Sequence, residues 1–373
     1  MNRYPMNCFA LALIVTLAAC GGGGGGGGGG SGGGGGVNID TPVSITGSNF
    51  SQVASLAVRS NLIVADSPNY NEGYPAGAVG NAPLPSVNVM NLSRVQLVEI
   101  NKVKPNEMVS AELPIGAAPV GGTTNCASGG TKTKTFTDDD NNLTTLRVGD
   151  KLVIDYANCA FALQQEANNC VLISETNKNV TLNGAVETQI TEVTSPLVYK
   201  SQLTYTNLVV TTARGTATIN GKLLISLAAG PPQITLTSVD GSPLTQAVGG
   251  VTERLRVATI QYNDDQQGCD VNIPNNNNYT IFNTTRGEVA SSDLGFVNFT
   301  VPINLVGDSD SAGGGFPEAG TVRIDGAGGT FMTIVAAGGS TANVTINGRA
   351  VSCPTTPTWL QIFNGQLAAA GCT

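Results

Sequence analysis

The clearest pattern in the chain is an alternation of apolar and polar residues with a period of two. From Phe296 to Leu305, the odd positions carry Val, Phe, Val, Ile and Leu, and the even positions among them carry Asn, Thr, Pro and Asn. Such an alternation predicts a half-buried β-strand with one face in water. Pro302 has no backbone N–H group, so we expect it at a sheet edge or at a β-bulge.

Further strands are predicted where short β-rich runs lie between turn residues. They are expected at Thr131–Phe136, Lys151–Tyr156, Ser201–Thr211, Gln233–Ser238, Leu255–Tyr262, Thr321–Ile324, Phe331–Val335 and Ala342–Ile346. Asn-Gly dipeptides suit two-residue type I′ turns, so we expect Val180–Ile190 and Ala217–Leu227, which are centred on such dipeptides, to be β-hairpins. The chain is predicted to be mainly β: a large antiparallel sheet, sandwich or half-barrel with one or two short N-terminal helices.

Helical spacing of apolar residues occurs near the start of this β-rich region. Phe50–Arg59 is the stronger candidate, and Ser48 or Asn49 precedes it as an N-cap. A weaker candidate, Asn91–Lys102, is rich in β-branched residues, which favour a strand instead. Two such helices would make residues 37–110 an N-terminal α/β portion of the β domain.

The first twenty residues are typical of an exported protein. Met1–Ala19 combines a basic residue, a short apolar run and small residues, as in a secretory signal peptide. Leu17-Ala18-Ala19-Cys20 resembles the lipobox of bacterial lipoproteins, which implies cleavage before Cys20 and lipid attachment to it. Gly21 follows instead of Asp, and by analogy with Gram-negative sorting this implies the outer membrane, on its periplasmic face or at the cell surface. The alternative is an ordinary signal peptide with Cys20 in a disulfide.

A glycine run separates this leader from the β-rich region. Residues 21–36 are glycine except for Ser31. Glycine-rich chain cannot bury apolar surface and behaves as a random coil, so the run predicts a tether of about 20 to 25 Å on average. We therefore expect a signal peptide at 1–19, a lipidated Cys20 with its poly-glycine tether at 20–36, and an antiparallel β domain at 37–373.

Composition excludes several kinds of chemistry. The chain has no His, which excludes Ser-His-Asp hydrolysis, Cys-His nucleophiles and His-ligated zinc or haem. The formal net charge of −8 argues against nucleic acid as a partner. The sequence also lacks the motifs of serine hydrolases and zinc proteases. Together these absences predict a protein that is not an enzyme.

Six cysteines follow Cys20, and an even number in an exported chain predicts disulfides formed in an oxidising compartment. The first two flank one predicted hairpin, whose pairing would bring them together. The last two would pin the C-terminus, which leaves the middle two as a third pair. The expected pairs are Cys126–Cys159, Cys353–Cys372 and Cys170–Cys269.

The loop of that first hairpin carries the most site-like residues of the sequence. Alternate oxygen-bearing side chains, followed by a carboxylate about twelve positions on, have the spacing of a calcium loop. The candidate Ca²⁺ ligands are Asp138, Asp140, Asn142 and Asp150. Leu143 stands where such a loop needs Gly, so the simpler alternative is an acidic, solvated β-turn.

Three segments together resemble a pattern in uncharacterised proteobacterial lipoproteins. They are Cys126-Ala-Ser-Gly-Gly, Asp138-Asp-Asp-Asn-Asn and Val148-Gly-Asp-Lys-Leu-Val-Ile-Asp-Tyr-Ala-Asn-Cys159. The resemblance extends to an Asn-headed helix at Asn49, a glycine-rich strand segment at Gly320–Gly329 and a late Trp359. It implies a Gram-negative lipoprotein and carries no assigned activity.

Three functions remain open from the sequence. The first is a membrane-anchored binding or structural module of the outer membrane, whose partner is an envelope protein or a polysaccharide. The second is a carrier of lipid or another hydrophobic ligand, with an apolar groove enclosed by a curved sheet. The third is a carboxylate-dependent polysaccharide hydrolase, which acidic residues such as Asp264, Asp265 and Asp270 would serve if they faced each other. The tether and the missing catalytic set favour the first.

Overall fold

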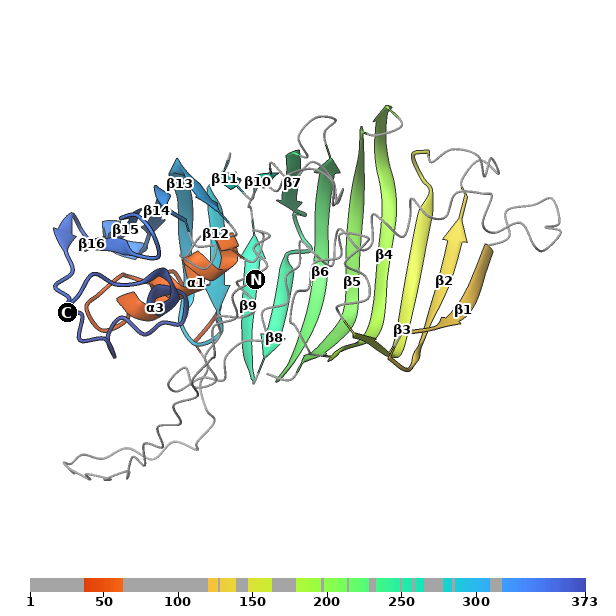
Figure 1. The fold of residues 1–373 in the computed structure, drawn as a ribbon, viewed down its shortest axis with the longest axis horizontal. Helices are drawn as coiled ribbons and strands as arrows, with labels where there is room; N and C mark the ends of the chain where they lie inside the picture. The colour runs from red at the N-terminus through yellow and green to blue at the C-terminus, as the bar shows by residue number, and fades with distance from the viewer. Residues whose placement is uncertain are drawn as a thin grey trace, which may run out of the picture. The chain divides into compact units, whose positions relative to one another are not determined.

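One antiparallel β-sheet dominates the structure (Figure 1). A computed structural model describes residues 37–62, 120–126, 128–138, 147–162, 179–195, 198–212, 215–227, 233–248, 250–256, 259–264, 278–283, 286–308 and 317–373. All of them belong to one compact unit. The prediction of a mainly-β antiparallel fold with few helices is confirmed.

The described strands and helices are bounded as follows. The strands are β1 (Val120–Asn125), β2 (Thr131–Thr137), β3 (Lys151–Ala162), β4 (Asn179–Ser195), β5 (Val198–Thr212), β6 (Gly215–Leu227), β7 (Gln233–Ser238), β8 (Leu244–Val248), β9 (Val251–Arg256), β10 (Thr259–Asp264), β11 (Asn278–Asn283), β12 (Gly287–Ser291), β13 (Gly295–Asp308), β14 (Ala319–Asp325), β15 (Phe331–Ala336), β16 (Ala342–Ile346) and β17 (Arg349–Ala350). The helices are α1 (Phe50–Leu62), the short 3₁₀ helix η4 (Ala327–Gly329) and α3 (Trp359–Phe363).

The strands follow one another across the sheet nearly in sequence order. β1 to β6 pair in series, and β13 to β17 pair in series. Between these two series each long strand is divided in two. β7 and β8 both pair with β6. β10 pairs with β7 and with β11, and β9 pairs with β8 and with β12. β11 and β12 both pair with β13. The described sheet is therefore an up-and-down meander built from pairings that are close in sequence.

The two faces of the sheet differ sharply in burial. Successive side chains of a strand point to opposite faces. In β3, Leu152, Ile154 and Cys159 are fully buried, whereas Lys151 and Asp155 on the opposite side reach solvent. We call the side of the sheet that carries Leu152 the inner face and the side that carries Asp155 the outer face. The apolar half of the alternation thus forms the core, as the period-two pattern predicts.

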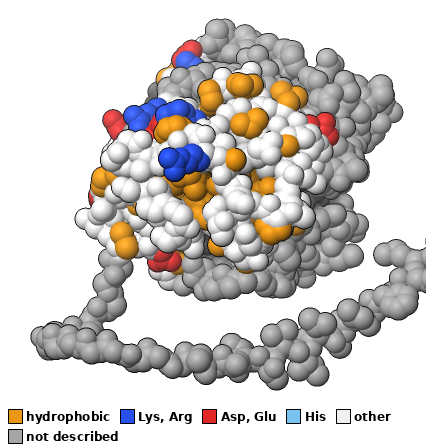
Figure 2. Space-filling model, turned by 90° about the vertical axis from the view of Figure 1, so that its left-hand side faces the viewer, with side chains coloured by type: hydrophobic (Ala, Val, Ile, Leu, Met, Phe, Trp, Pro, Cys, Tyr) orange, Lys and Arg blue, Asp and Glu red, His pale blue; other side chains and the backbone are white. Residues whose placement is uncertain are grey.

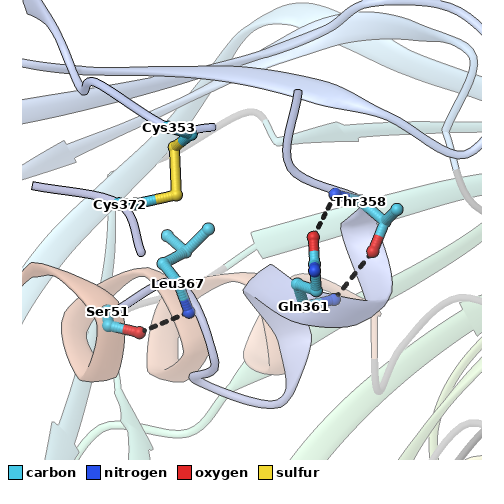
Figure 3. Close-up of a disulfide and its surroundings, with 6 residues drawn as sticks. All are labelled: Ser51, Cys353, Thr358, Gln361, Leu367 and Cys372. Atoms are coloured by element: carbon cyan, nitrogen blue, oxygen red, sulfur yellow. Dashed lines mark hydrogen bonds between the residues drawn. A yellow bond between two sulfur atoms is a disulfide. The ribbon is translucent and has the colours of Figure 1, made fainter. Parts of the chain in front are cut away.

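Helix α1 packs against β12, β13 and β14, and the short helix α3 packs against α1 (Figure 1). Phe50 of α1 and Phe363 of α3 are almost fully buried. Two buried serines of α1 bond to the backbone of the C-terminal segment, residues 353–373. Ser55 Oγ donates to the carbonyl of Phe363. Ser51 Oγ accepts the N–H of Leu367 at 3.0 Å (Figure 3). The C-terminal segment is therefore held on α1 by specific hydrogen bonds as well as by apolar contact.

The start and the end of the C-terminal segment are both fixed locally. Thr358 and Gln361 form a capping box at the N-terminus of α3, with N–H to side-chain oxygen distances of 2.9 and 3.2 Å (Figure 3). The disulfide Cys353–Cys372 joins the segment that precedes α3 to the end of the chain. Trp359, the first residue of α3, is fully buried. The resemblance singled out this tryptophan, and the structure gives it a place in the core.

The first predicted helix is confirmed, and α1 runs to Leu62 instead of ending at Arg59. Asn49 precedes it, and its carbonyl accepts the N–H of Val53 at 3.0 Å. The side chain of Asn49 bonds to the preceding loop, where its Oδ1 accepts the N–H of Thr46 at 2.8 Å. Asn49 therefore orders the loop that leads into the helix. The second candidate, at residues 91–102, lies outside the described residues.

The two hairpins predicted at Asn-Gly dipeptides are wrong. β4 runs through Asn183-Gly184 and β6 runs through Asn220-Gly221 without turning. A type I′ turn needs positive φ at both central residues, but at these two places only the glycine has it. Asn347-Gly348 does have both, with φ of 50° and 77°, and it forms the turn between β16 and β17.

Four strand predictions show where the sequence pattern succeeds and where it fails. The predicted bounds of β7 and β16 match the structure at both ends. Pro302 lies at a β-bulge of β13, as expected. The bulge shifts the alternation, so Ile303 is 62% exposed although the pattern predicts it on the buried face. The single strand predicted from Leu255 to Tyr262 is divided into β9 and β10.

Candidate functional site

A line of β-bulges crosses the outer face from β3 to β6. Register shifts occur in β3 beside Asn158, in β4 beside Gly184 and in β5 beside Asn207. Asn158 and Asn207 adopt positive φ of 49° and 45°, a conformation that Asn tolerates better than most residues. On β6 the line continues at Asn220, which bonds to the bulge of β5. One asparagine from each of four successive strands, including Asn183 of β4, thus lies along this line.

The bulges of β3 and β5 are each closed by an asparagine side chain from the next strand. Asn183 Oδ1 accepts the backbone N–H of Asn158 at 2.7 Å, and Asn220 Oδ1 accepts the backbone N–H of Asn207 at 2.7 Å. A bulge takes one residue out of the ladder and leaves its N–H without a strand partner. The same side-chain solution therefore occurs twice, once between β3 and β4 and once between β5 and β6.

Glycines let the backbones approach closely along this line. A Cβ atom at Gly184 would lie 2.3 Å from the carbonyl oxygen of Asn207, and one at Gly221 would lie 2.1 Å from that of Pro243. Gly130, beside the β2 end of the line, would bring a Cβ equally close to the carbonyl of Asn158. The glycines next to the asparagines are thus required by the bulges, not by turns.

The four asparagines Asn158, Asn183, Asn207 and Asn220 are called the Asn row below. Asn158 and Asn207 are exposed, and the other two are half-buried. Within the described part of the chain, the side-chain NH₂ groups of all four form no hydrogen bond. The side-chain oxygens of Asn158 and Asn207 form none either. The Asn row therefore offers several unused donors and acceptors on one face.

The outer-face residues on either side of the Asn row are uncharged except for Asp155 and Lys222, which have opposite signs. They include Asp155, Ala185, Thr206 and Lys222 on one side, and Ala160, Thr181, Val209 and Thr218 on the other. Threonine is both β-branched and polar, so it suits a strand face that meets water. The surroundings of the Asn row are thus broad, hydroxyl-rich and nearly neutral.

The described surface at the β14–β16 side of the molecule has a different character (Figure 2). Hydrophobic side chains there lie in small separate groups among uncharged polar surface, with few charged residues. Ile303, Val306 and Val335 are the large apolar side chains most exposed on β13 and β15. Arg323 stacks over the Phe331 ring at 4.5 Å from its centroid. Scattered apolar residues of this kind are ordinary surface and do not define a site.

A buried ion pair links α1 to the sheet. Arg59 of α1 bonds to Glu253 of β9, whose side chain is 11% exposed. Burial raises the pKa of Glu253, while Arg59 opposes this shift and the nearby Asp293 adds to it. The pair joins residues far apart in sequence, so it holds the helix at a fixed place on β9.

A second charged cluster fixes the N-terminal segment on the opposite side of β9. Arg254 bonds to Asp40 at 2.8 Å and to Glu288 at 3.1 Å, and Arg256 also bonds to Glu288. The hydrogen bond to Glu288 raises the pKa of Arg256, which keeps that guanidinium charged. Glu288 is buried and has an arginine on each side. Charged groups paired in this way are typical of structural anchoring, and we assign this cluster that role.

Two of the three predicted disulfides are confirmed. Cys126–Cys159 joins the end of β1 to β3 with a Cα–Cα distance of 5.4 Å, and Cys353–Cys372 closes the C-terminal segment. The predicted pairing of β2 with β3 places the first two cysteines together, as expected. The third pair, Cys170 and Cys269, lies outside the described residues.

The calcium hypothesis stays a prediction. Asp140 and Asn142 lie outside the described residues. Asp150 is buried and its carboxylate accepts the backbone N–H of Arg147 at 2.7 Å, closing the turn that leads into β3. Among the residues that the structure describes, Asp138 included, no cluster of His, Cys, Asp or Glu suitable for a metal ion occurs. Asp150 thus has a structural explanation that does not require calcium.

The remaining predicted positions are unevenly covered. Cys20 and the glycine tether lie outside the described residues, as do Asp265 and Asp270, while Asp264 ends β10. No helix in the described ranges has the length and apolar character needed to cross a membrane.

Comparison with known proteins gives no relative. No protein-family model, no curated protein and no solved structure matches this chain. What the chain does must therefore be inferred from its own residues.

Sequence reasoning missed the Asn row, although a signal is present. Tyr156-Ala-Asn158 and Tyr205-Thr-Asn207 have the same form, and each bulge is paired with an Asn-Gly dipeptide on the next strand. The repeating unit is a pair of adjacent strands, β3 with β4 and β5 with β6. The loops that join the strands differ in length, so the repeat produces no fixed period along the chain.

Proposed function

We propose that this protein is a binding module tethered to the outer membrane, and that the outer face of β3 to β6 contacts its partner in the cell envelope. The observation that carries this proposal is the Asn row. Unused side-chain amide groups lie along successive strands of an exposed face on which the charged neighbours, Asp155 and Lys222, have opposite signs. A solvated face without a partner needs no such alignment of strained asparagines.

The Asn row is also rigid, which favours binding. Asn158 and Asn207 are held at positive φ, and each has its N–H fixed by a side chain from the next strand. The disulfide Cys126–Cys159 ends one residue away from Asn158. The backbone that carries these amides is already ordered, so binding costs only the rotational freedom of the side chains.

The anchoring part of the proposal is supported by the leader. A lipidated Cys20 would hold the chain at the membrane, and the glycine tether would let the domain reach a partner some distance away. This arrangement suits a protein that contacts other envelope components.

Burial of the inner face favours this function over a lipid carrier. The inner-face residues Leu152, Ile154, Leu203 and Ile219 are fully buried. A carrier would instead expose an apolar groove to its ligand. No observation among the described residues favours a carboxylate-dependent hydrolase.

Fractionation of cells tests the anchoring. Cells producing the full chain or its Cys20→Ser variant are separated into inner-membrane, outer-membrane and soluble fractions. We expect the unmodified chain in the outer-membrane fraction and the variant to be lost from it. Equal distribution of the two chains would contradict lipid anchoring. Protease added to intact cells then distinguishes the cell surface from the periplasmic face.

Sedimentation with envelope fragments tests binding. The purified Cys20→Ser chain has no lipid of its own, so any co-sedimentation reports contacts of the protein. We expect it to pellet with fragments and to remain soluble without them. The same chain with its disulfides reduced and its fold lost by denaturant is the control. Absence of co-sedimentation would show that the binding proposal is wrong.

A further inference from the structure

We propose that the Asn row binds a neutral polysaccharide that lies across β3 to β6, at right angles to the strands. This inference rests on the proposed binding function and names its ligand class. The Asn row supplies the direct contacts, and the threonines on either side supply further hydroxyl groups to the same chain.

The spacing of the Asn row fits a repeating polymer. Adjacent strands lie about 4.8 Å apart, so three steps from Asn158 to Asn220 cover roughly 14 Å. A pyranose residue in an extended polysaccharide is close to one strand spacing in length. A polymer across the strands would therefore present successive sugars to successive asparagines, whereas a compact ligand would meet only one or two.

The chemistry of the Asn row fits hydroxyl groups. A side-chain amide carries a donor and an acceptor side by side, which matches two neighbouring hydroxyls of a sugar. Asn158 and Asn207 keep both groups unused, and Asn183 and Asn220 keep their NH₂ donors. The amide planes are uncharged, so the Asn row does not select a charged polymer.

Charge does not favour an anionic polysaccharide as the ligand. The chain has a formal net charge of −8, and the two charged residues beside the Asn row, Asp155 and Lys222, have opposite signs. The net negative charge would repel an acidic polymer. These flanking rows also contain no aromatic residue on which a sugar ring could stack, so we expect weak affinity for a single chain segment, strengthened where many tethered copies contact one polymer.

The unusual backbone of the Asn row permits a clean test. Glycine adopts positive φ without strain, so Asn158→Gly and Asn207→Gly remove both exposed amides and keep the backbone N–H groups that Asn183 and Asn220 bind. Asn347→Gly is the matched control. Asn347 also has positive φ but lies in the turn between β16 and β17.

Native affinity electrophoresis measures binding of the oxidised full chain, in gels that contain hydroxyethyl cellulose, dextran or the anionic polymer alginate. We expect at least one of the two neutral polymers to retard the chain and alginate to have little effect. The Asn158→Gly/Asn207→Gly double variant should bind about tenfold more weakly, since each lost hydrogen bond contributes about 0.5 to 1.5 kcal/mol. The Asn347→Gly variant should bind like the unmodified chain.

Melting temperatures of all three chains are measured together with binding. Unchanged binding of the double variant, equal loss in the Asn347→Gly variant, or preference for alginate would overturn the inference. If neither neutral polymer retards the chain while envelope fragments still co-sediment with it, the ligand class is wrong and the proposed function stands. If the fragments also fail to co-sediment with it, both are wrong.

Discussion

Two regions of this protein use the same β-sheet in different ways. At the helix-backed end, formed by β12 to β16 with α1 and α3, large side chains such as Phe50 and Trp359 are removed from water. In the bulged region, formed by β3 to β6, asparagines close the backbone and leave their own amides exposed. The comparison teaches that packing fixes the first region, whereas backbone hydrogen bonds shape the second and leave its outer face free for contacts.

The largest effect is expected from removing the tryptophan of the helix-backed end. Trp359→Ala empties a fully buried position, so the free energy of unfolding should fall by about 3 to 5 kcal/mol. Denaturant unfolding followed by far-UV circular dichroism measures it, because this is the only Trp and its fluorescence is lost with it. Ile303→Ala, at a position 62% exposed, is the control and should change stability by less than about 0.5 kcal/mol. Equal effects of the two substitutions would show that this end is not held by packing.

A smaller effect is expected from blocking the close backbone approach in the bulged region. Gly184→Ala places a Cβ against the carbonyl of Asn207 and strains a φ of 102°, so we expect a loss of about 2 to 3 kcal/mol. Gly241→Ala is the matched control, because its φ of 73° is also positive but nothing lies within 4 Å of the added atom. It should cost about 1 kcal/mol from backbone strain alone. If both variants lose the same stability, close packing of β4 on β5 is not what requires glycine.

The smallest expected effect is a dependence on pH at the helix-backed end. Because burial raises the pKa of Glu253 in the folded state, the folded protein binds this proton more tightly than the unfolded chain. The stabilisation that comes from protonating Glu253 is therefore complete below about pH 4.3, the ordinary pKa of Glu. It is lost as the pH rises through the higher pKa that Glu253 has in the folded state. Glu253→Gln should remove this dependence.

The difference in unfolding free energy between wild type and Glu253→Gln, measured from pH 4 to pH 8, tests this directly. We expect the wild type to lose stability relative to the variant as the pH rises above about 4.3 and through the higher folded-state pKa of Glu253. A difference that is constant with pH would contradict the raised pKa. Arg59 stays in place in both proteins, so the comparison isolates the carboxyl group.

Local features of the sequence predict much of this fold. Short β-rich runs between turn residues predict β7 and β16 to the residue, and apolar spacing predicts the start of α1. The pairing of β2 with β3 is enough to predict the disulfide Cys126–Cys159. These features depend on residues that are near in sequence, and the meander keeps such residues near in space.

Features that depend on a distant partner are not predictable in this way. Asn-Gly has the same local preference in a hairpin turn and beside a bulge, and only the neighbouring strand decides between them. For Asn220 the deciding partner is Asn207, whose bulge requires an acceptor. Likewise, nothing near Ser51 indicates that it bonds to Leu367 of the C-terminal segment. The candidate site consists of such contacts, which explains why the Asn row was missed and acidic loops were favoured.

Hydrogen exchange of the full chain, with and without the neutral polymer that retards it, tests the contrast between the two regions most directly. Hydroxyethyl cellulose and dextran are the two probes, and alginate is the control. The account predicts that the polymer slows exchange in peptides from β3 to β6, next to the Asn row, and leaves α1, α3 and β14 to β16 unchanged. Slower exchange confined to the helix-backed end, or no change in either region, would contradict it.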